Sequence, residues 1–169
     1  ISILSLMKFV ILQLSLCMLL FSGTTMSMQL DGQHRPASIK PQKILIVYLS
    51  RTNNTKIIAE IIHKYVGGDL VALELEKPYP DQYKAIVDQV ADENETGFLP
   101  VLKTKIEHIE SYDVVFIGFP TWGMQLPPPL KSFLKAYDLA GKRIIPFNSH
   151  AGYGVGSSFE TVKQLAPHS

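Results

Sequence analysis

Residues 43–66, KILIVYLSRTNNTKIIAEIIHKYV, decide the fold. The run ILIVYL at 44–49 is apolar throughout, which is typical of a parallel strand covered by helices on both faces. From residue 57 onward the apolar side chains recur at helical spacing and predict a helix with one buried stripe. Between the two lies a loop of hydroxyl and amide side chains. In open α/β sheets ligands bind at such strand ends, and the free N–H groups of a helix start favour an anion.

The first 42 residues have a different character. From Met7 the chain carries one lysine, a mostly apolar core at 9–21 and small or polar residues at 22–27, a pattern that predicts a secretory signal peptide. This apolar segment is shorter than the about 20 residues of a membrane span, which favours the signal peptide. The alternative is an N-terminal anchor or a buried helix. Residues 28–42 contain two prolines and no periodicity, as a linker does.

These segments predict three parts: a signal-like segment at 1–27, a linker at 28–42 and one domain at 43–169. If the first segment is cleaved, the protein is expected to be exported, periplasmic or extracellular, with no stable membrane span in its mature form. If it is retained, the protein is expected to be membrane-anchored. The 16 basic and 15 acidic residues nearly balance, so the charge gives no indication of nucleic-acid binding.

Beyond residue 66, strand and helix patterns alternate. Strand patterns occupy 69–77, 113–119 and 143–148, and helix patterns occupy 81–95, the segment that follows three prolines at 127–129, and 157–165. Residues 97–110 predict a loop with at most one short helical turn. Ser157 and Glu160 have the spacing of a capping box. The alternation predicts an α/β fold, a parallel sheet with helices on both faces and the fourth strand at an exposed edge.

Three polar or glycine-rich loops follow buried strands and are expected at one edge of the sheet. Residues 50–55 can surround a phosphate, although helix capping explains the same residue types. They lack the glycines of a Walker loop and of a dinucleotide-binding loop. Trp122 in the second loop can stack on a flat conjugated ring, or it can pack on the neighbouring prolines. The third loop, 148–156, has three glycines that permit close approach of a ligand, but a flexible connector has the same composition.

Taken together, SRTNNT, GFPTWG and NSHAGYG resemble the three flavin-binding loops of the flavodoxin-like family, over residues 43–167. The resemblance implies a three-layer α/β/α open parallel sheet of order 2-1-3-4, with the family's fifth strand missing from this chain, and FMN bound noncovalently at the carboxyl ends of the strands. The family has glycine where this chain has Asn53, a residue type that tolerates left-handed backbone angles. The implied FMN-binding residues are Ser50, Thr52, Asn53, Asn54 and Thr55 at the phosphate, with Arg51 in the same loop, Pro120, Thr121, Trp122 and Gly123 along one flavin face, and Asn148, Ser149, Gly152 and Tyr153 at the pyrimidine edge and the other face.

The resemblance implies an FMN-binding electron-transfer protein, with a redox protein or a small-molecule electron donor or acceptor as its partner. An FMN-dependent NAD(P)H:quinone or flavin reductase on the same fold is the second hypothesis. A cofactor-free interaction module or truncated remnant is the third. No residue in the three loops is a convincing acid, base, nucleophile or metal ligand. Redox chemistry on this fold needs none, since the flavin itself carries it. Whether the protein is an enzyme therefore stays open.

Overall fold

The structure is a computed structural model, and it describes residues 41–169. The predicted signal-like segment and most of the linker lie outside this range. The elements are β1 (Ile44–Tyr48), α2 (Asn54–Val66), β2 (Asp69–Ala72), α3 (Tyr83–Thr96), the 3-10 helix η1 (Ile109–Ser111), β3 (Val114–Pro120), α4 (Pro128–Ala136), β4 (Arg143–Ser149) and α5 (Ser158–Leu165). None of the helices within residues 41–169 has the length and hydropathy of a membrane span.

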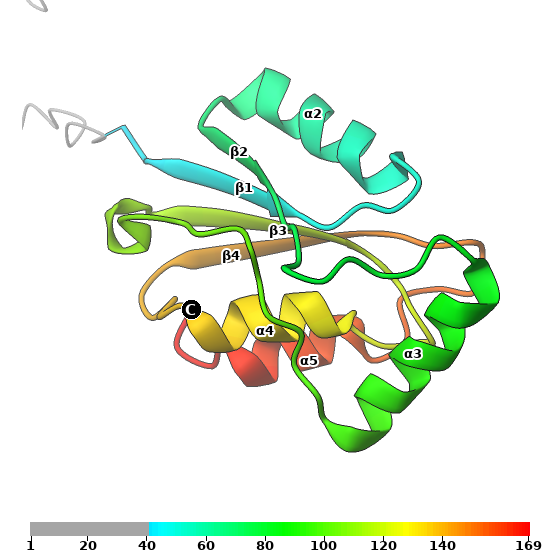
Figure 1. The fold of residues 1–169 in the computed structure, drawn as a ribbon. Helices are drawn as coiled ribbons and strands as arrows, with labels where there is room; N and C mark the ends of the chain where they lie inside the picture. Colours follow the sequence, from blue (N-terminus) through cyan, green and yellow to red (C-terminus); the bar gives the residue numbers. More distant parts are fainter. Residues whose placement is uncertain (1–40) are drawn as a thin grey trace, which may run out of the picture. The chain divides into compact units, whose positions relative to one another are not determined.

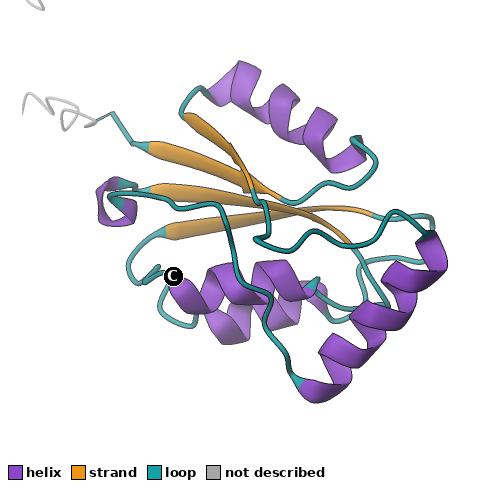
Figure 2. Cartoon of the chain, in the orientation of Figure 1, coloured by secondary structure: helices purple, strands orange, loops and turns teal. Residues whose placement is uncertain are grey.

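The four strands form one parallel sheet of order β2-β1-β3-β4, which confirms the predicted fold class and strand order. The apolar run of β1 lies at the centre of this sheet, where Leu45, Ile46 and Val47 are fully buried. Helix α2 covers one face, and α4 and α5 cover the other (Figures 1 and 2). The larger part of the core fills the α4–α5 side around Phe119 and Phe133, because two helices pack there against one on the other face.

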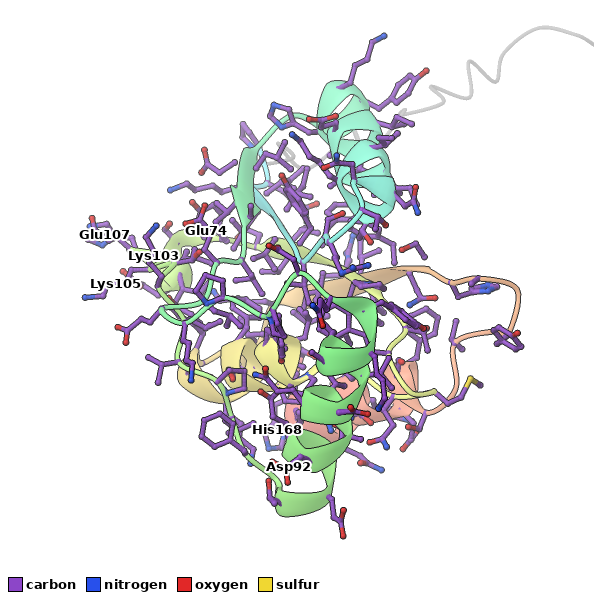
Figure 3. All side chains as sticks on the ribbon, turned by 45° about the vertical axis from the view of Figure 1, so that its right-hand side comes forward. Glu74, Asp92, Lys103, Lys105, Glu107 and His168 are labelled. Carbon is purple, nitrogen blue, oxygen red and sulfur yellow. The ribbon has the colours of Figure 1, made fainter. Side chains whose placement is uncertain are left out.

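Strand β2 is shorter than the predicted 69–77. It follows β1 only as far as Ala72, because β1 itself ends at Tyr48. The next residues pair elsewhere: Leu75 bridges Leu102, and the exposed ion pair between Lys103 Nζ and Glu74 Oε2 spans 2.9 Å (Figure 3). Residues 73–77 therefore lead away from the sheet toward α3.

The predicted capping box at the start of α5 does not form. The side chain of Ser157 makes no cap hydrogen bond to the helix. Its backbone N–H instead donates to the carbonyl of Met124, at 3.0 Å. The start of α5 is thus held by the loop that follows β3, a contact that a local sequence pattern cannot encode.

Strand β4 is the edge strand that the sequence predicted. Among the described strands it pairs only with β3. Arg143 N–H donates to the carbonyl of Asp113, at 2.9 Å, so it points toward β3. Because N–H groups alternate in direction along a strand, those of Ile144 and Asn148 point to the free edge. Pro146 lies between these two positions and has no N–H. The free edge of β4 therefore carries an interrupted row of donors.

Candidate functional site

The three loops singled out in the sequence meet at the carboxyl edge of the sheet, as expected. Thr55, in the first turn of α2, is buried, and its Oγ1 lies 2.7 Å from Ser149 Oγ at the end of β4. The carbonyl of Ser149 accepts a hydrogen bond from the N–H of Thr121, at 3.0 Å. These two bonds join the loops after β1, β3 and β4 into one unit.

The loop after β1 presents free N–H groups at the start of α2. Asn53 has φ 63° and ψ −6°, the left-handed conformation that asparagine tolerates. Its carbonyl accepts the first helical bond, from Ile57 N at 2.9 Å, and Ser50 Oγ accepts from Lys56 N at 3.2 Å. Within residues 41–169 the N–H groups of 52–55 donate no hydrogen bond. Ser50 thus caps part of the helix start, and the remaining N–H groups are available to an anion.

Arg51 points away from these N–H groups, toward the start of α3. Its Nη2 donates to the carbonyl of Asp81 at 3.3 Å, and its guanidinium lies 5.8 Å from the centre of the Tyr83 ring. The side chain therefore links the loop after β1 to the segment that precedes α3. Its contact with FMN stays a prediction.

Trp122 lies on a tight turn. Trp122 and Gln125 exchange backbone hydrogen bonds of 3.2 and 3.0 Å, and both intervening residues are left-handed, Gly123 at φ 56° and Met124 at φ 60°. This pair of positive φ angles is characteristic of a two-residue hairpin turn. The turn fixes the backbone from which the indole projects.

The indole of Trp122 packs on Tyr79, a residue that the sequence analysis did not identify. The ring centres lie 5.3 Å apart at 87°, an edge-to-face contact. The hydroxyl of Tyr79 donates to Oε2 of Glu93 at 2.5 Å. Burial of the ring and this hydrogen bond raise the pKa of Tyr79 well above its ordinary value. Tyr79 therefore keeps its proton and acts as a donor to the carboxylate.

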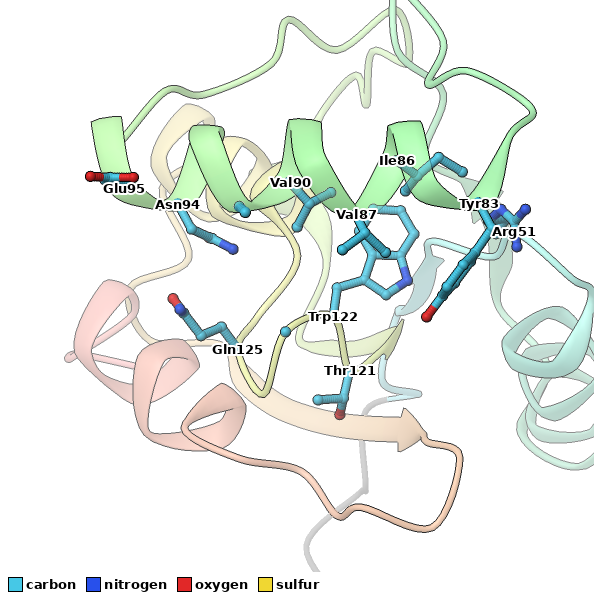
Figure 4. A pocket seen from close by; sticks show the side chains of 12 residues that line it. Arg51, Tyr83, Ile86, Val87, Val90, Asn94, Glu95, Thr121, Trp122 and Gln125 are labelled. Carbon is cyan, nitrogen blue, oxygen red and sulfur yellow. The ribbon is translucent and has the colours of Figure 1, made fainter.

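Two adjoining hollows flank Trp122. One, of about 320 Å³, lies between residues 50–52, Tyr79 and Trp122. The other, of about 460 Å³, lies between α3 and the Trp122 turn (Figure 4). Both are lined by Arg51, Ile86 and Trp122, so they form a continuous surface from the loop after β1 to the indole. The larger hollow is lined by Arg51, Tyr83, Ile86, Val87, Val90, Ala91, Asn94, Glu95, Thr121, Trp122, Gly123 and Gln125.

The sequence does not predict that α3 lines the larger hollow. It predicts the helix from its apolar spacing, but a stripe that lines a hollow has the same spacing as one that packs on a core. Only the structure shows the difference, because Tyr83 is 72% and Val87 46% exposed while Ile86 is buried. The exposed apolar residues lie beside Trp122 and not against the sheet (Figure 4).

The loop after β4 lines neither hollow. The Asn148 amide donates to the carbonyl of Phe119 at 3.0 Å and to Thr121 Oγ1 at 2.9 Å, so it ties the second and third loops together. His150 Nδ1 accepts from the N–H groups of Gly152 and Gly154, and Tyr153 is 82% exposed. Contacts of Asn148, Ser149, Gly152 and Tyr153 with a ligand stay a prediction.

Comparison with known proteins identifies the family of this chain. A family model described as flavodoxin matches residues 43–169. A flavodoxin of Synechocystis sp. (strain ATCC 27184 / PCC 6803 / Kazusa) is 25% identical over 122 residues, and the match covers 70% of this chain and 58% of that protein. The chain thus spans less than two thirds of the length of this relative.

Two solved structures share the fold. A candidate flavoprotein from Bacteroides eggerthii DSM 20697 is 34% identical, with a TM-score of 0.69 over 75% of this chain and 82% of that chain. A flavoprotein from Lactobacillus acidophilus NCFM, solved in complex with FMN, is 23% identical, with a TM-score of 0.64 over 74% of this chain and 86% of that chain. On the match of the family model over residues 43–169, this chain belongs to the flavodoxin family.

Proposed function

We propose that the protein binds FMN noncovalently at the carboxyl edge of its sheet and transfers electrons through it. Membership of the flavodoxin family and the FMN complex of the Lactobacillus acidophilus relative support this proposal. The observation that carries it is the continuity of the site: the hollows beside Trp122 extend to the loop whose N–H groups are free. A ligand with a phosphate at one end and a flat ring at the other matches both halves.

The helix start is suited to the FMN phosphate. Free N–H groups and the positive end of the helix dipole stabilise a bound anion there. Asn54 Nδ2 donates to Thr52 Oγ1 at 3.3 Å, which satisfies one acceptor position of that hydroxyl and leaves its hydrogen free to donate to a phosphate oxygen. The N–H groups of residues 52–55 and the Thr52 hydroxyl are therefore the proposed phosphate ligands.

The hollow beside Trp122 is suited to the flavin ring. Ile86, Val90 and the indole of Trp122 supply apolar surface, which a flat conjugated ring requires. The amides of Asn94 and Gln125 face each other across the hollow (Figure 4) and supply hydrogen bonds for the polar edge of the ring. This placement puts α3 against the flavin in addition to the residues implied by the family resemblance.

Bound FMN supplies the redox chemistry of such a site. The residues of this chain bind the phosphate, orient the ring and shield one side of it from water. The proposed partner is a redox protein or a small-molecule electron donor or acceptor. Export of the mature protein is likewise proposed from the signal-like segment.

Fluorescence titration of the purified protein tests this proposal. We expect wild-type protein to quench FMN fluorescence, and Trp122→Ala to weaken binding of both FMN and riboflavin by about 1–3 kcal/mol, the range measured for stacking of a base on an aromatic ring. Thr52→Ala is expected to weaken binding of FMN much more than binding of riboflavin, which has no phosphate. Thr96→Ala, at the far end of α3, is the matched control and should bind as wild type does.

Two results would count against the proposal. If wild-type protein leaves FMN fluorescence unchanged, the chain does not bind this cofactor. If Thr52→Ala weakens FMN and riboflavin binding equally, the phosphate does not lie at residues 52–55.

A further inference from the structure

Glu93 is a buried acidic residue on α3 that lines neither hollow, but its neighbour Asn94 lines the larger one and its partner Tyr79 lines the smaller one. Its side chain is 4% exposed. Oε2 accepts a hydrogen bond from the Tyr79 hydroxyl at 2.5 Å, and Oε1 accepts from Gln89 Nε2 at 2.7 Å. Both partners are donors, which is the arrangement that an ionised carboxylate needs.

No cation balances this charge. In the part of the chain that the structure describes, no lysine, arginine or histidine forms an ion pair with Glu93. The ammonium of Lys131, on α4, donates to Oδ1 of Asn94, the residue after Glu93, at 2.8 Å. Burial of a carboxylate without a counter-ion is costly, so hydrogen bonds alone stabilise this one. A glutamine oxygen can accept from the Tyr79 hydroxyl, and its NH2 group then faces Gln89, whose amide can present its own oxygen in turn.

Glu93 is connected to Trp122 through one residue. Tyr79 lies in the irregular segment between β2 and α3, where no helix or strand fixes its ring. The hydrogen bond to Glu93 holds the hydroxyl end of Tyr79, and the ring of Tyr79 meets the indole edge to face at 5.3 Å. The raised pKa of Tyr79 keeps this donor protonated. The position of the Tyr79 ring against the indole therefore depends on an acceptor oxygen at position 93.

We propose that Glu93 is a positioning residue of the FMN site, which orients Trp122 through Tyr79 and whose buried negative charge lowers the reduction potential of bound FMN. This inference rests on the proposed function. Reduction adds negative charge to the isoalloxazine, and a carboxylate nearby in a poorly solvated region disfavours the reduced form more than the oxidised form. The charge and the orientation can be separated, because Glu93→Gln removes the charge and keeps an acceptor oxygen for the Tyr79 hydroxyl, whereas Tyr79→Phe removes that hydroxyl.

The first measurement is the midpoint potential of FMN bound to the purified protein, by equilibration with a reference dye. Glu93→Gln is expected to raise the potential, so that binding of reduced FMN relative to oxidised FMN becomes stronger on the order of tenfold, the effect of one partly buried unit charge. Asp92→Asn is the matched control, since it removes the same charge from the adjacent, exposed position of α3. We expect a much smaller shift there, because solvent screens an exposed charge.

The second measurement needs no FMN. Trp122 is the one tryptophan of the sequence, so its fluorescence reports on this contact alone. Tyr79→Phe is expected to make Trp122 more accessible to acrylamide, whereas Glu93→Gln, which keeps an acceptor for the Tyr79 hydroxyl, is expected to leave accessibility close to that of wild type. Thermal unfolding of each variant verifies that it is folded, and Tyr79→Phe tests the orientation even if Glu93→Gln is unstable.

The outcomes distinguish this inference from the proposed function. A wild-type protein that does not bind FMN refutes the proposed function. A protein that binds FMN with the same potential in wild type and Glu93→Gln overturns the role of the charge. Unchanged acrylamide quenching in Tyr79→Phe overturns the orientation of Trp122 through Tyr79.

Discussion

Replacement of Thr55 with valine removes one hydroxyl from the junction between α2 and β4. Thr55 is 1% exposed and its Oγ1 lies 2.7 Å from Ser149 Oγ. Valine has nearly the same shape as threonine, so the stability lost is mainly that of the hydrogen bond, about 0.5–1.5 kcal/mol. The Ser149 hydroxyl also loses its partner, which adds part of the about 1–3 kcal/mol that an unpaired buried hydroxyl costs. Water can reach the half-buried Ser149, so we expect the free energy of unfolding to fall by about 1–2 kcal/mol.

A double-mutant cycle measures this contribution. Urea denaturation of wild type, Thr55→Val, Ser149→Ala and the double variant gives the coupling energy between the two hydroxyls, which we expect to be about 1 kcal/mol. The double variant should then be hardly less stable than Thr55→Val. If the two single effects add, the side chains do not interact, and the loops after β1 and β4 are not joined by this bond.

Two further perturbations follow from the geometry. Gly156→Ala should lower the melting temperature more than Gly154→Ala. Both glycines have a positive φ, 54° at Gly156 and 90° at Gly154, but only at position 156 would the new methyl group collide with the Met124 carbonyl. Equal losses of melting temperature in the two variants would contradict this packing. The hydrogen bond from Tyr112 to Asp69 raises the pKa of Tyr112 from 10.0 to about 12, so its contribution to stability is complete below pH 10 and is lost as the pH rises through 12. Between pH 10 and pH 12 the free energy of unfolding, measured by urea titration, should decline more steeply in wild type than in Tyr112→Phe. Parallel declines would show that the Tyr112–Asp69 hydrogen bond does not stabilise the fold.

Much of the fold could be predicted because the sheet imposes a strong pattern. An unbroken apolar run such as 44–49, bounded by polar residues, favours a central strand, and the burial of β1 agrees with that. The ends of elements were less predictable. Leu73 and Leu75 continue the alternation of β2, yet the strand ends at Ala72, because β1 ends at Tyr48. Leu73 N–H makes the last bond to β1, at the Tyr48 carbonyl, and Leu75 bridges Leu102. Where a strand stops depends on its partner, which lies elsewhere in the chain.

The candidate site was predictable where chemistry follows strand ends. Parallel strands deliver their loops to one edge, so the meeting of Thr55, Thr121 and Ser149 required no knowledge of side-chain packing. The role of α3 was not predictable on these grounds. Glu93 stands in the sequence among other acidic residues, and only the approach of Tyr79 distinguishes it from its exposed neighbours. Contacts between an irregular segment and a helix leave no periodic trace.

Pro146, in the middle of the edge strand β4, has a consequence for the association of separate molecules. A strand from another chain that added to this edge would find the donors of Ile144 and Asn148 and none between them. Proline at such an edge weakens intermolecular sheet extension, which is a common route to aggregation. Among the strands described in residues 41–169, the edge of β4 is therefore a poor template for sheet growth between molecules.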